Sequence, residues 1–161
     1  MQSPPLNTIL VIDEIPTIAL GLQEVFRSLN KSVDVQSIEN VFTVLSSRSY
    51  EGKRFDLIVI GDMSEDPTLN LPQAIAELKN RFGNSKIMIY TLNYNHANIE
   101  KMEESAIDAY IHKYEPIAEI CKAYSCLAAG EGYISGIFHT LYYEYCLRLD
   151  KLPPHKDQPG S

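Results

Sequence analysis

The nine residues FDLIVIGDM at positions 55–63 decide the fold of this 161-residue chain. Positions 57–60 are four consecutive bulky apolar residues, three of them β-branched, and Gly61 and Asp62 follow them directly. A run this short that is apolar on both faces is typical of a central strand in a parallel sheet, which helices cover on both sides. The chemistry of such sheets lies just beyond the carboxyl ends of the strands, so Gly61 and Asp62 stand where a site would be.

Other strand-like runs lie before and after this one, and helical patterns separate them. The other predicted strands cover residues 7–12, 33–38, 86–90 and 107–111. Apolar residues recur at helical spacing over residues 16–30, 41–45, 71–82, 97–104 and 115–128. This alternation predicts an α/β fold of the flavodoxin-like type, with a five-stranded, doubly wound parallel sheet.

Residues 133–152 are predicted to add a C-terminal helix to this unit. Apolar and aromatic side chains recur there at helical spacing, at Phe138, Leu141, Tyr142, Tyr145 and Leu149. They predict a helix over residues 135–149 with an aromatic stripe, which has to be buried against the domain or against a second copy of the chain. Residues 153–161 have the composition of a linker or tail, as expected of a chain cut from a longer protein.

Composition narrows the class of protein. The 21 acidic and 14 basic residues leave a net charge of -7. Phosphate neutralisation requires clustered lysine and arginine, so this chain by itself is not predicted to bind nucleic acid. Cys121, Cys126 and Cys146 lack metal-binding spacing, as is usual in a reduced cytoplasmic protein. No stretch approaches about 18 apolar residues, so we expect cytoplasmic localisation and no membrane contact.

Polar side chains follow the predicted strands at their carboxyl ends. Asp13 and Glu14 follow the first strand, Asp62 the central one, Thr91 the fourth and Lys113 the fifth. Because the carboxyl ends of parallel strands meet at one edge of the sheet, these side chains are expected to share one rim. An alternative interpretation makes Asp13 and Glu14 only a carboxylate pair near the positive end of the first helix dipole.

This ordered set resembles the receiver domains of response regulators, most closely those of the LuxR-type (NarL-like) transcription regulators. The resemblance covers about residues 7–132. The intervals from Gly61 to Thr91 and from Thr91 to Lys113 are those usual in the family, and residues 128–135 (AAGEGYIS) are typical of its LuxR-type branch. The resemblance implies a CheY-like form of the predicted fold.

The resemblance also implies roles for single residues. In the family, an acidic pair after the first strand and an aspartate ending the third hold Mg²⁺, and that aspartate accepts a phosphoryl group. Asp13 and Glu14 match the acidic pair. A hydroxyl ending the fourth strand and a lysine ending the fifth bind the phosphoryl oxygens, and these positions are matched by Thr91 and Lys113. Tyr110 matches the aromatic residue of the switch.

The sequence departs from the family at the phosphate acceptor. The acceptor follows an aspartate and four apolar residues, and counting from Asp56 this position is Gly61, which has no nucleophile. Asp62 comes one residue later, and because successive strand side chains point to opposite faces, we expect it to point away from Thr91 and Lys113. The alternative is a one-residue slip or a bulge at Gly61 that turns Asp62 back toward them.

The same departure weakens the predicted metal site. A family-type Mg²⁺ site would use Asp13, Glu14 and Asp62, yet Mg²⁺ is usually bound through one or two carboxylates together with substrate phosphate and water. Without the acceptor and the phosphate, only Asp13 and Glu14 remain. We therefore expect no cofactor, with Mg²⁺ as the alternative, and a salt bridge from Lys113 that partly neutralises the two carboxylates.

These observations predict a non-enzymatic pseudo-receiver in residues 1–132, which acts in signal transduction and transcription regulation through protein contacts. The alternative is an active receiver that accepts a phosphoryl group on Asp62 with Mg²⁺. A flavodoxin-like cofactor binder is disfavoured because no glycine-rich phosphate loop follows the first strand. Expected partners are a second copy of the chain, a histidine kinase or another regulator, and DNA only through an output domain that this chain lacks.

Overall fold

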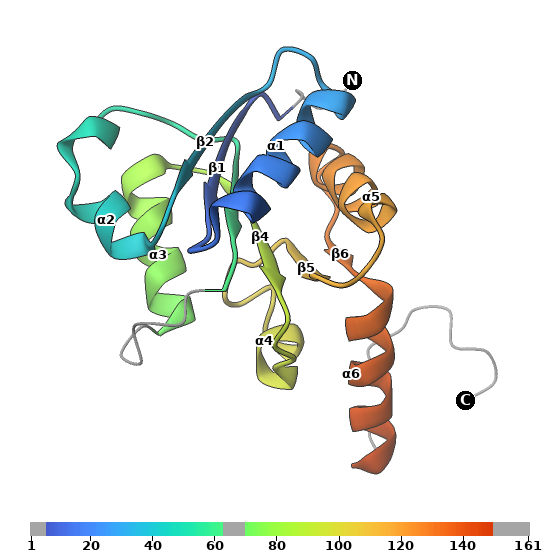
Figure 1. Cartoon of the computed structure of the whole chain (residues 1–161). Coiled ribbons are helices and arrows are strands. Elements are labelled where there is room, and N and C mark those ends of the chain that lie inside the picture. Colours follow the sequence, from blue (N-terminus) through green and yellow to red (C-terminus); the bar gives the residue numbers. More distant parts are fainter. Residues whose placement is uncertain (1–5, 63–69, 150–161) are drawn as a thin grey trace.

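Among the described residues, six parallel strands form one sheet at the centre of the fold, and helices cover both of its faces (Figure 1). The computed structural model describes residues 6–62 and 70–149. The strands are β1 Thr8–Ile12, β2 Asp34–Ile38, β3 Leu57–Ile60, β4 Lys86–Thr91, β5 Ala109–His112 and β6 Tyr133–Ile134. Their order in the sheet is β2-β1-β3-β4-β5-β6, so β3 lies in the interior as predicted.

The sixth strand corrects the expected count of five. β6 contains two residues, a length at which hydrophobic periodicity gives no signal. It joins the sheet through two backbone hydrogen bonds, from Tyr133 N–H to the Asp108 carbonyl at 3.0 Å and from Ser135 N–H to the Tyr110 carbonyl at 2.9 Å. The doubly wound arrangement of the other five strands is the one predicted.

The helices divide between the two faces of the sheet. They are α1 Pro16–Leu29, α2 Val41–Ser46, α3 Leu71–Phe82, α4 His96–Glu100, α5 Ile117–Ala128 and α6 Gly136–Arg148, with a short 3-10 helix at Arg48–Tyr50. Helices α1 and α5 cover one face, where they pack against Ile9, Val11 and Val59. The other helices cover the opposite face, which includes Ile58 and Ile60. β3 is therefore buried on both sides, which explains its uninterrupted apolar sequence.

Helix α4 is shorter than the sequence suggests. The pattern over residues 97–104 predicts two turns, but α4 ends at Glu100 and turns lead on to Ala106, which has a φ of 59°. Asn95 caps its start by accepting a hydrogen bond from the Asn98 N–H at 3.2 Å. Only Ile99 of this helix is buried. Burial of so little apolar surface contributes little to the stability of a short helix.

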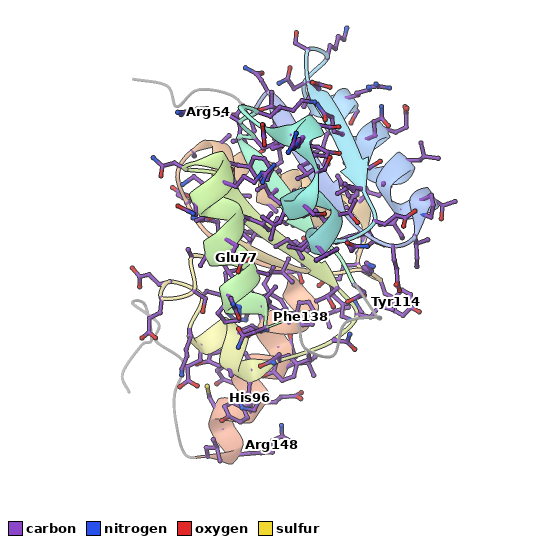
Figure 2. The ribbon with its side chains drawn as sticks, turned by 90° about the vertical axis from the view of Figure 1, so that its left-hand side faces the viewer. Arg54, Glu77, His96, Tyr114, Phe138 and Arg148 are labelled. Carbon is purple, nitrogen blue, oxygen red and sulfur yellow. The ribbon has the colours of Figure 1, made fainter. Side chains whose placement is uncertain are left out.

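Helix α6 is the predicted C-terminal helix, and its aromatic stripe packs against its own domain. Phe138 is completely buried, and its ring centroid lies 4.9 Å from that of Tyr110 in β5. At the far end of the contact, Tyr145 stacks on His96 of α4 with 4.0 Å between ring centroids. Figure 2 shows Phe138 and His96 along this contact. The predicted tail at residues 153–161 lies outside the described residues.

Two carboxylates of the preceding segment hold the start of α6. Glu119 of α5 accepts hydrogen bonds from the Gly136 N–H at 3.0 Å and from the Tyr133 hydroxyl at 2.9 Å. Glu115 accepts one from the Ile137 N–H at 3.1 Å. Burial raises the pKa of Glu119, but its hydrogen bonds from Gly136, Tyr133 and Lys122 outweigh burial, so its pKa lies below the usual value. The negative charges thus stabilise the positive end of the α6 dipole.

No helix within residues 6–62 and 70–149 combines the length and the apolar character needed to cross a membrane.

Candidate functional site

The candidate site lies at the carboxyl edge of four neighbouring strands, β1, β3, β4 and β5. The register pairs Ile12 of β1 with Ile60 of β3, and Thr91 of β4 with His112 of β5. Asp13 and Asp62 come just after β1 and β3, Thr91 ends β4, and Lys113 follows β5. The sheet topology therefore brings together the residues that the sequence predicted to share one rim.

Lys113 joins the two aspartates of the site. Its Nζ atom lies 2.8 Å from Asp13 Oδ2 and 3.2 Å from Asp62 Oδ2. The side chain of Asp13 is fully buried, that of Lys113 is 6% exposed, and that of Asp62 is 24% exposed. Burial by itself would lower the pKa of Lys113, but the hydrogen bond and charge of Asp13, and then the charge of Asp62, outweigh it and raise that pKa. The predicted salt bridge from Lys113 is present on Asp13.

Asp62 faces the site, so the expectation that it points away from Thr91 and Lys113 is wrong. Its Oδ1 atom accepts a hydrogen bond from the Thr91 hydroxyl, and its Oδ2 atom accepts one from the Leu92 N–H at 3.1 Å. The Asn93 side-chain amide is 3.5 Å from Oδ1. The expectation failed because β3 ends at Ile60, so the alternation of a strand no longer governs the direction of Asp62.

Gly61 leaves a space that Asp13 occupies. A Cβ atom built on Gly61 would lie 2.7 Å from Asp13 Cγ and 3.0 Å from Asp13 Cβ, and closer still to Oδ2. The glycines with positive φ are Gly52, Gly83 and Gly130, so the backbone at Gly61 does not require glycine. The carboxylate of Asp13 therefore occupies the space that a side chain at position 61, the position that matches the family's acceptor by resemblance, would take.

The residues of the site do not fit a divalent cation as they stand. Mg²⁺ requires oxygen ligands in near-octahedral arrangement, whereas the Lys113 ammonium lies between the oxygens of Asp13 and Asp62. Oδ1 of Asp13 is engaged as well, because it accepts a hydrogen bond from the Ile15 N–H at 2.8 Å. Within the part of the chain that the structure describes, no three His, Cys, Asp or Glu side chains form a group suited to a metal ion.

Tyr110 is connected to the site through Asn93. Its ring is buried, and its hydroxyl lies 3.5 Å from the Asn93 carbonyl. The Asn93 N–H in turn donates to the Thr91 hydroxyl oxygen at 3.0 Å. Burial raises the pKa of Tyr110 above its ordinary value. Because Phe138 of α6 packs edge-on against Tyr110, a continuous set of contacts leads from Asp62 to α6.

Two groups of this site were not predicted. The Leu92 N–H is a backbone donor and leaves no signal in the sequence. Asn93 could have been found, because an asparagine two residues after a strand-end threonine is typical of a turn with side-chain to backbone hydrogen bonds. Glu14 follows Asp13 on the same rim and is half-buried.

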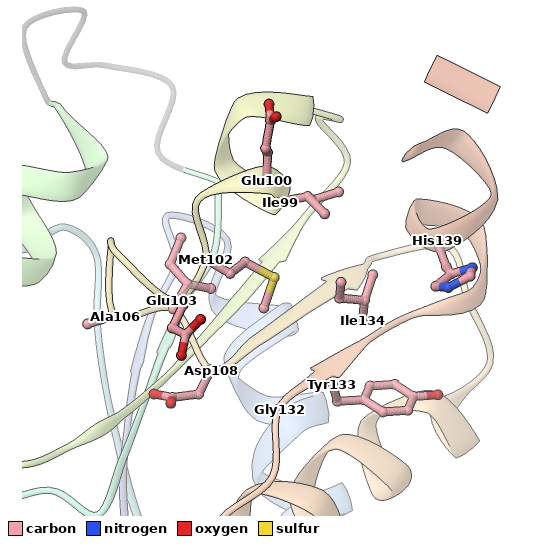
Figure 3. A pocket seen from close by; sticks show the side chains of 11 residues that line it. Ile99, Glu100, Met102, Glu103, Ala106, Asp108, Gly132, Tyr133, Ile134 and His139 are labelled. Carbon is pink, nitrogen blue, oxygen red and sulfur yellow. The ribbon is translucent and has the colours of Figure 1, made fainter. Parts of the chain in front are cut away.

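A separate cavity of about 650 Å³ lies between α4 with the turns that follow it, the short strand β6 and the first turn of α6 (Figure 3). Its walls combine apolar and acidic side chains, among them Ile99, Met102, Ile134, Glu100 and Glu103. The Asp108 carboxylate beside it accepts a hydrogen bond from the Ile87 N–H at 2.8 Å, which is a structural role. This cavity contributes no residue to the site at the carboxyl edge.

Comparison with known proteins identifies the fold. A scan against protein-family models and a search of curated proteins found no match. Solved structures do match. The isolated REC domain of RcsB from Salmonella enterica serovar Typhimurium, in the presence of phosphomimetic BeF3-, gives a TM-score of 0.69 at 18% identity, covering 86% of this chain and 99% of that chain. A LuxR-family two-component response regulator from Aurantimonas sp. SI85-9A1 gives 0.72 at 19% identity, covering 88% and 99%.

A longer structure of the RcsB response regulator from Salmonella typhimurium gives a TM-score of 0.73 at 16% identity, covering 94% of this chain and 74% of that chain. At these identities the likeness establishes the fold. The chain thus has the fold of a response-regulator receiver domain, and the predicted CheY-like architecture is confirmed.

Proposed function

We propose that this chain is the receiver domain of a LuxR-type response regulator and that it signals through protein contacts without aspartyl phosphorylation. The fold and the ordered set of rim residues support the family assignment. The observation that carries the second part is the acceptor position, where Gly61 has no side chain and the Asp13 carboxylate fills the space. A phosphoryl group has no nucleophile to join there.

Asp62 is a poor substitute for the missing acceptor. By family resemblance, the Thr91 hydroxyl and the Lys113 ammonium bind the oxygens of an incoming phosphoryl group. In this chain both groups already bind the Asp62 carboxylate itself. To act as the nucleophile, Asp62 would have to leave Thr91 and Lys113 and present an oxygen to phosphorus in line with the leaving group. The domain is therefore proposed to catalyse no reaction.

One observation favours the second candidate, an active receiver that uses Asp62 with Mg²⁺. Asp62 lies on the same side as Thr91 and Lys113, and its carboxylate is partly exposed, so its direction is compatible with attack on a phosphodonor. The arrangement of Lys113 between the two aspartates argues against the metal that this reaction needs.

Intact-mass measurement after incubation with acetyl phosphate and Mg²⁺ separates the two candidates. We expect no change in the mass of the wild-type chain. A gain of about 80 Da, the mass of one phosphoryl group, that is lost in Asp62→Asn would overturn the proposal. A receiver with an intact acceptor aspartate, treated in the same way, shows that the phosphodonor is active.

For output we propose a homodimer, as the structure of two RcsB dimers bound to two parallel DNAs shows for that protein. DNA contact would come from an output domain beyond this chain, and a histidine kinase or another regulator would be the further partner. Two apolar surfaces are available. Leu20 of α1 and Ile117 of α5 are each 60% exposed, and these two helices lie side by side. Tyr143 and Leu147 of α6 are 42% and 48% exposed.

Sedimentation of two double variants assigns the dimer surface. Replacing Leu20 and Ile117 by serine removes the first surface, and replacing Tyr143 and Leu147 by serine removes the second. One of the two variants is expected to dissociate at concentrations where the wild type is dimeric. A wild-type chain that stays monomeric throughout would contradict the proposed dimer.

A further inference from the structure

The structure points to an oxyanion site at the carboxyl edge of the sheet, and we infer that the Asp62 carboxylate is its built-in ligand. The site consists of the Thr91 hydroxyl, the Leu92 N–H and the Lys113 ammonium. Its ligand class is a small oxyanion with at least two oxygens, such as inorganic phosphate. This inference rests on the proposed function, because a carboxylate that occupies the site permanently leaves no place for a transferred phosphoryl group.

The three donors come from separate parts of the chain and meet on one carboxylate. The Thr91 hydroxyl ends β4 and donates to Asp62 Oδ1. The Leu92 N–H, at 3.1 Å, and Lys113 Nζ, at 3.2 Å, both approach Oδ2. A hydroxyl, a backbone N–H and an ammonium that converge in this way are the donors used for charge-assisted binding of carboxylate or phosphate oxygens. Asp62 lies two residues past the end of β3, so all three donors contact it outside the strand.

The charge of the site disfavours a second anion in the wild-type protein. Two carboxylates, of Asp13 and Asp62, face one ammonium, so the ionised side chains sum to a single negative charge. Removal of the Asp62 carboxylate leaves Lys113 paired with Asp13 at 2.8 Å, and the sum becomes zero. It also leaves the Thr91 hydroxyl and the Leu92 N–H without their acceptor, which is unfavourable in a partly buried site. A small anion supplies that acceptor and returns the site to the net negative charge that it has in the wild-type protein.

The occupied site also fixes the residues beyond it. With Asp62 in place, Thr91 is held by Oδ1 and receives the Asn93 N–H, and the Asn93 carbonyl lies beside the buried Tyr110 hydroxyl. The ring of Tyr110 packs against Phe138. The arrangement that the family reaches by adding a phosphoryl group is thus held in this chain by its own carboxylate. A response that depends on filling the oxyanion site would be permanent here.

The test compares Asp62→Ala with Asp62→Asn. Both variants remove the negative charge, but only alanine vacates the oxyanion site, because the asparagine amide keeps the size of the carboxylate. We expect Asp62→Ala to bind inorganic phosphate at least about tenfold more tightly than either the wild type or Asp62→Asn in calorimetric titration. Adding Thr91→Val to Asp62→Ala is expected to abolish that gain. Asp62→Ser, which also shortens the side chain, repeats the test if the alanine variant does not fold.

A second readout follows the residues behind the site. The amide resonance of Leu92 and the ring resonances of Tyr110 are expected to shift in Asp62→Ala and to return toward their wild-type positions as phosphate saturates the variant. The inference is overturned if Asp62→Ala binds phosphate no better than the wild type, or if Asp62→Asn binds it equally well. The two failures are distinguishable, because the proposed absence of aspartyl phosphorylation is contradicted by a different result, a covalent phosphoryl group on Asp62 of the wild-type chain.

Discussion

Replacing Gly61 by alanine tests whether Asp13 fills the space of the missing acceptor side chain. The new methyl group would lie 2.7 Å from Asp13 Cγ, so the carboxylate must move. Asp13 is buried, and both of its oxygens are engaged: Oδ2 with Lys113 Nζ at 2.8 Å and Oδ1 with the Ile15 N–H at 2.8 Å. Rotation of the side chain therefore breaks at least one of these contacts.

The expected loss in the free energy of unfolding is about 2–3 kcal/mol. A hydrogen bond to a charged group contributes roughly 1.5–3 kcal/mol, and the Ile15 contact adds about 1 kcal/mol. Replacing glycine by alanine returns roughly 0.4–1 kcal/mol through the unfolded chain, because the backbone at Gly61 accepts alanine. For a chain of this length the loss corresponds to a melting temperature lower by roughly 4–12 °C.

Urea and thermal unfolding followed by circular dichroism measure this loss. Gly21→Ala is the matched control, because a Cβ atom there meets no atom within 4 Å and Gly21 lies in the exposed part of α1. That control is expected to be neutral or slightly stabilising, by up to about 1 kcal/mol. A double-mutant cycle completes the test: in an Asp13→Ala background, Gly61→Ala should cost nothing further. Additive losses, or a Gly61→Ala variant as stable as the wild type, would refute the reasoning.

Four further predictions concern Lys113, Glu119 and Phe138. Lys113→Met leaves two carboxylates facing each other and should lower the free energy of unfolding by about 3–5 kcal/mol in urea unfolding. Because the pKa of Lys113 is raised, its stabilisation is present below about pH 10.4 and should be lost in thermal melts as pH rises through its folded-state pKa. The pKa of Glu119 is lowered, so its stabilisation of the Gly136 N–H should be fully present above about pH 4.3 and be lost as pH falls further through its folded-state pKa, with faster hydrogen exchange in α6. Phe138→Ala should cost about 3–5 kcal/mol, and a smaller loss would mean that α6 is not packed against β5.

The sequence by itself determined the sheet and the composition of its rim. The run at positions 57–60 is apolar on both faces, and only an interior parallel strand buries both faces of so short a segment. Once the strands are placed, chain connectivity puts Asp13, Thr91 and Lys113 at their carboxyl ends. These predictions rest on burial and on local periodicity, which are properties of the sequence near each residue.

Only the tertiary structure decided which side chains of the rim contact one another. The Asp62 side chain takes its direction from Thr91, 29 residues away, and Asp13 takes its own from Lys113, 100 residues away. Asp62 lies two residues past the end of β3, where the alternation of a strand no longer sets the direction of a side chain, so contacts between distant segments set it. The same holds for α6, whose stripe required burial but whose partner was settled by contact with β5 and α4. The local sequence pattern indicates which side chains must be buried and which polar groups need a hydrogen-bond partner. The folded structure determines which groups become those partners.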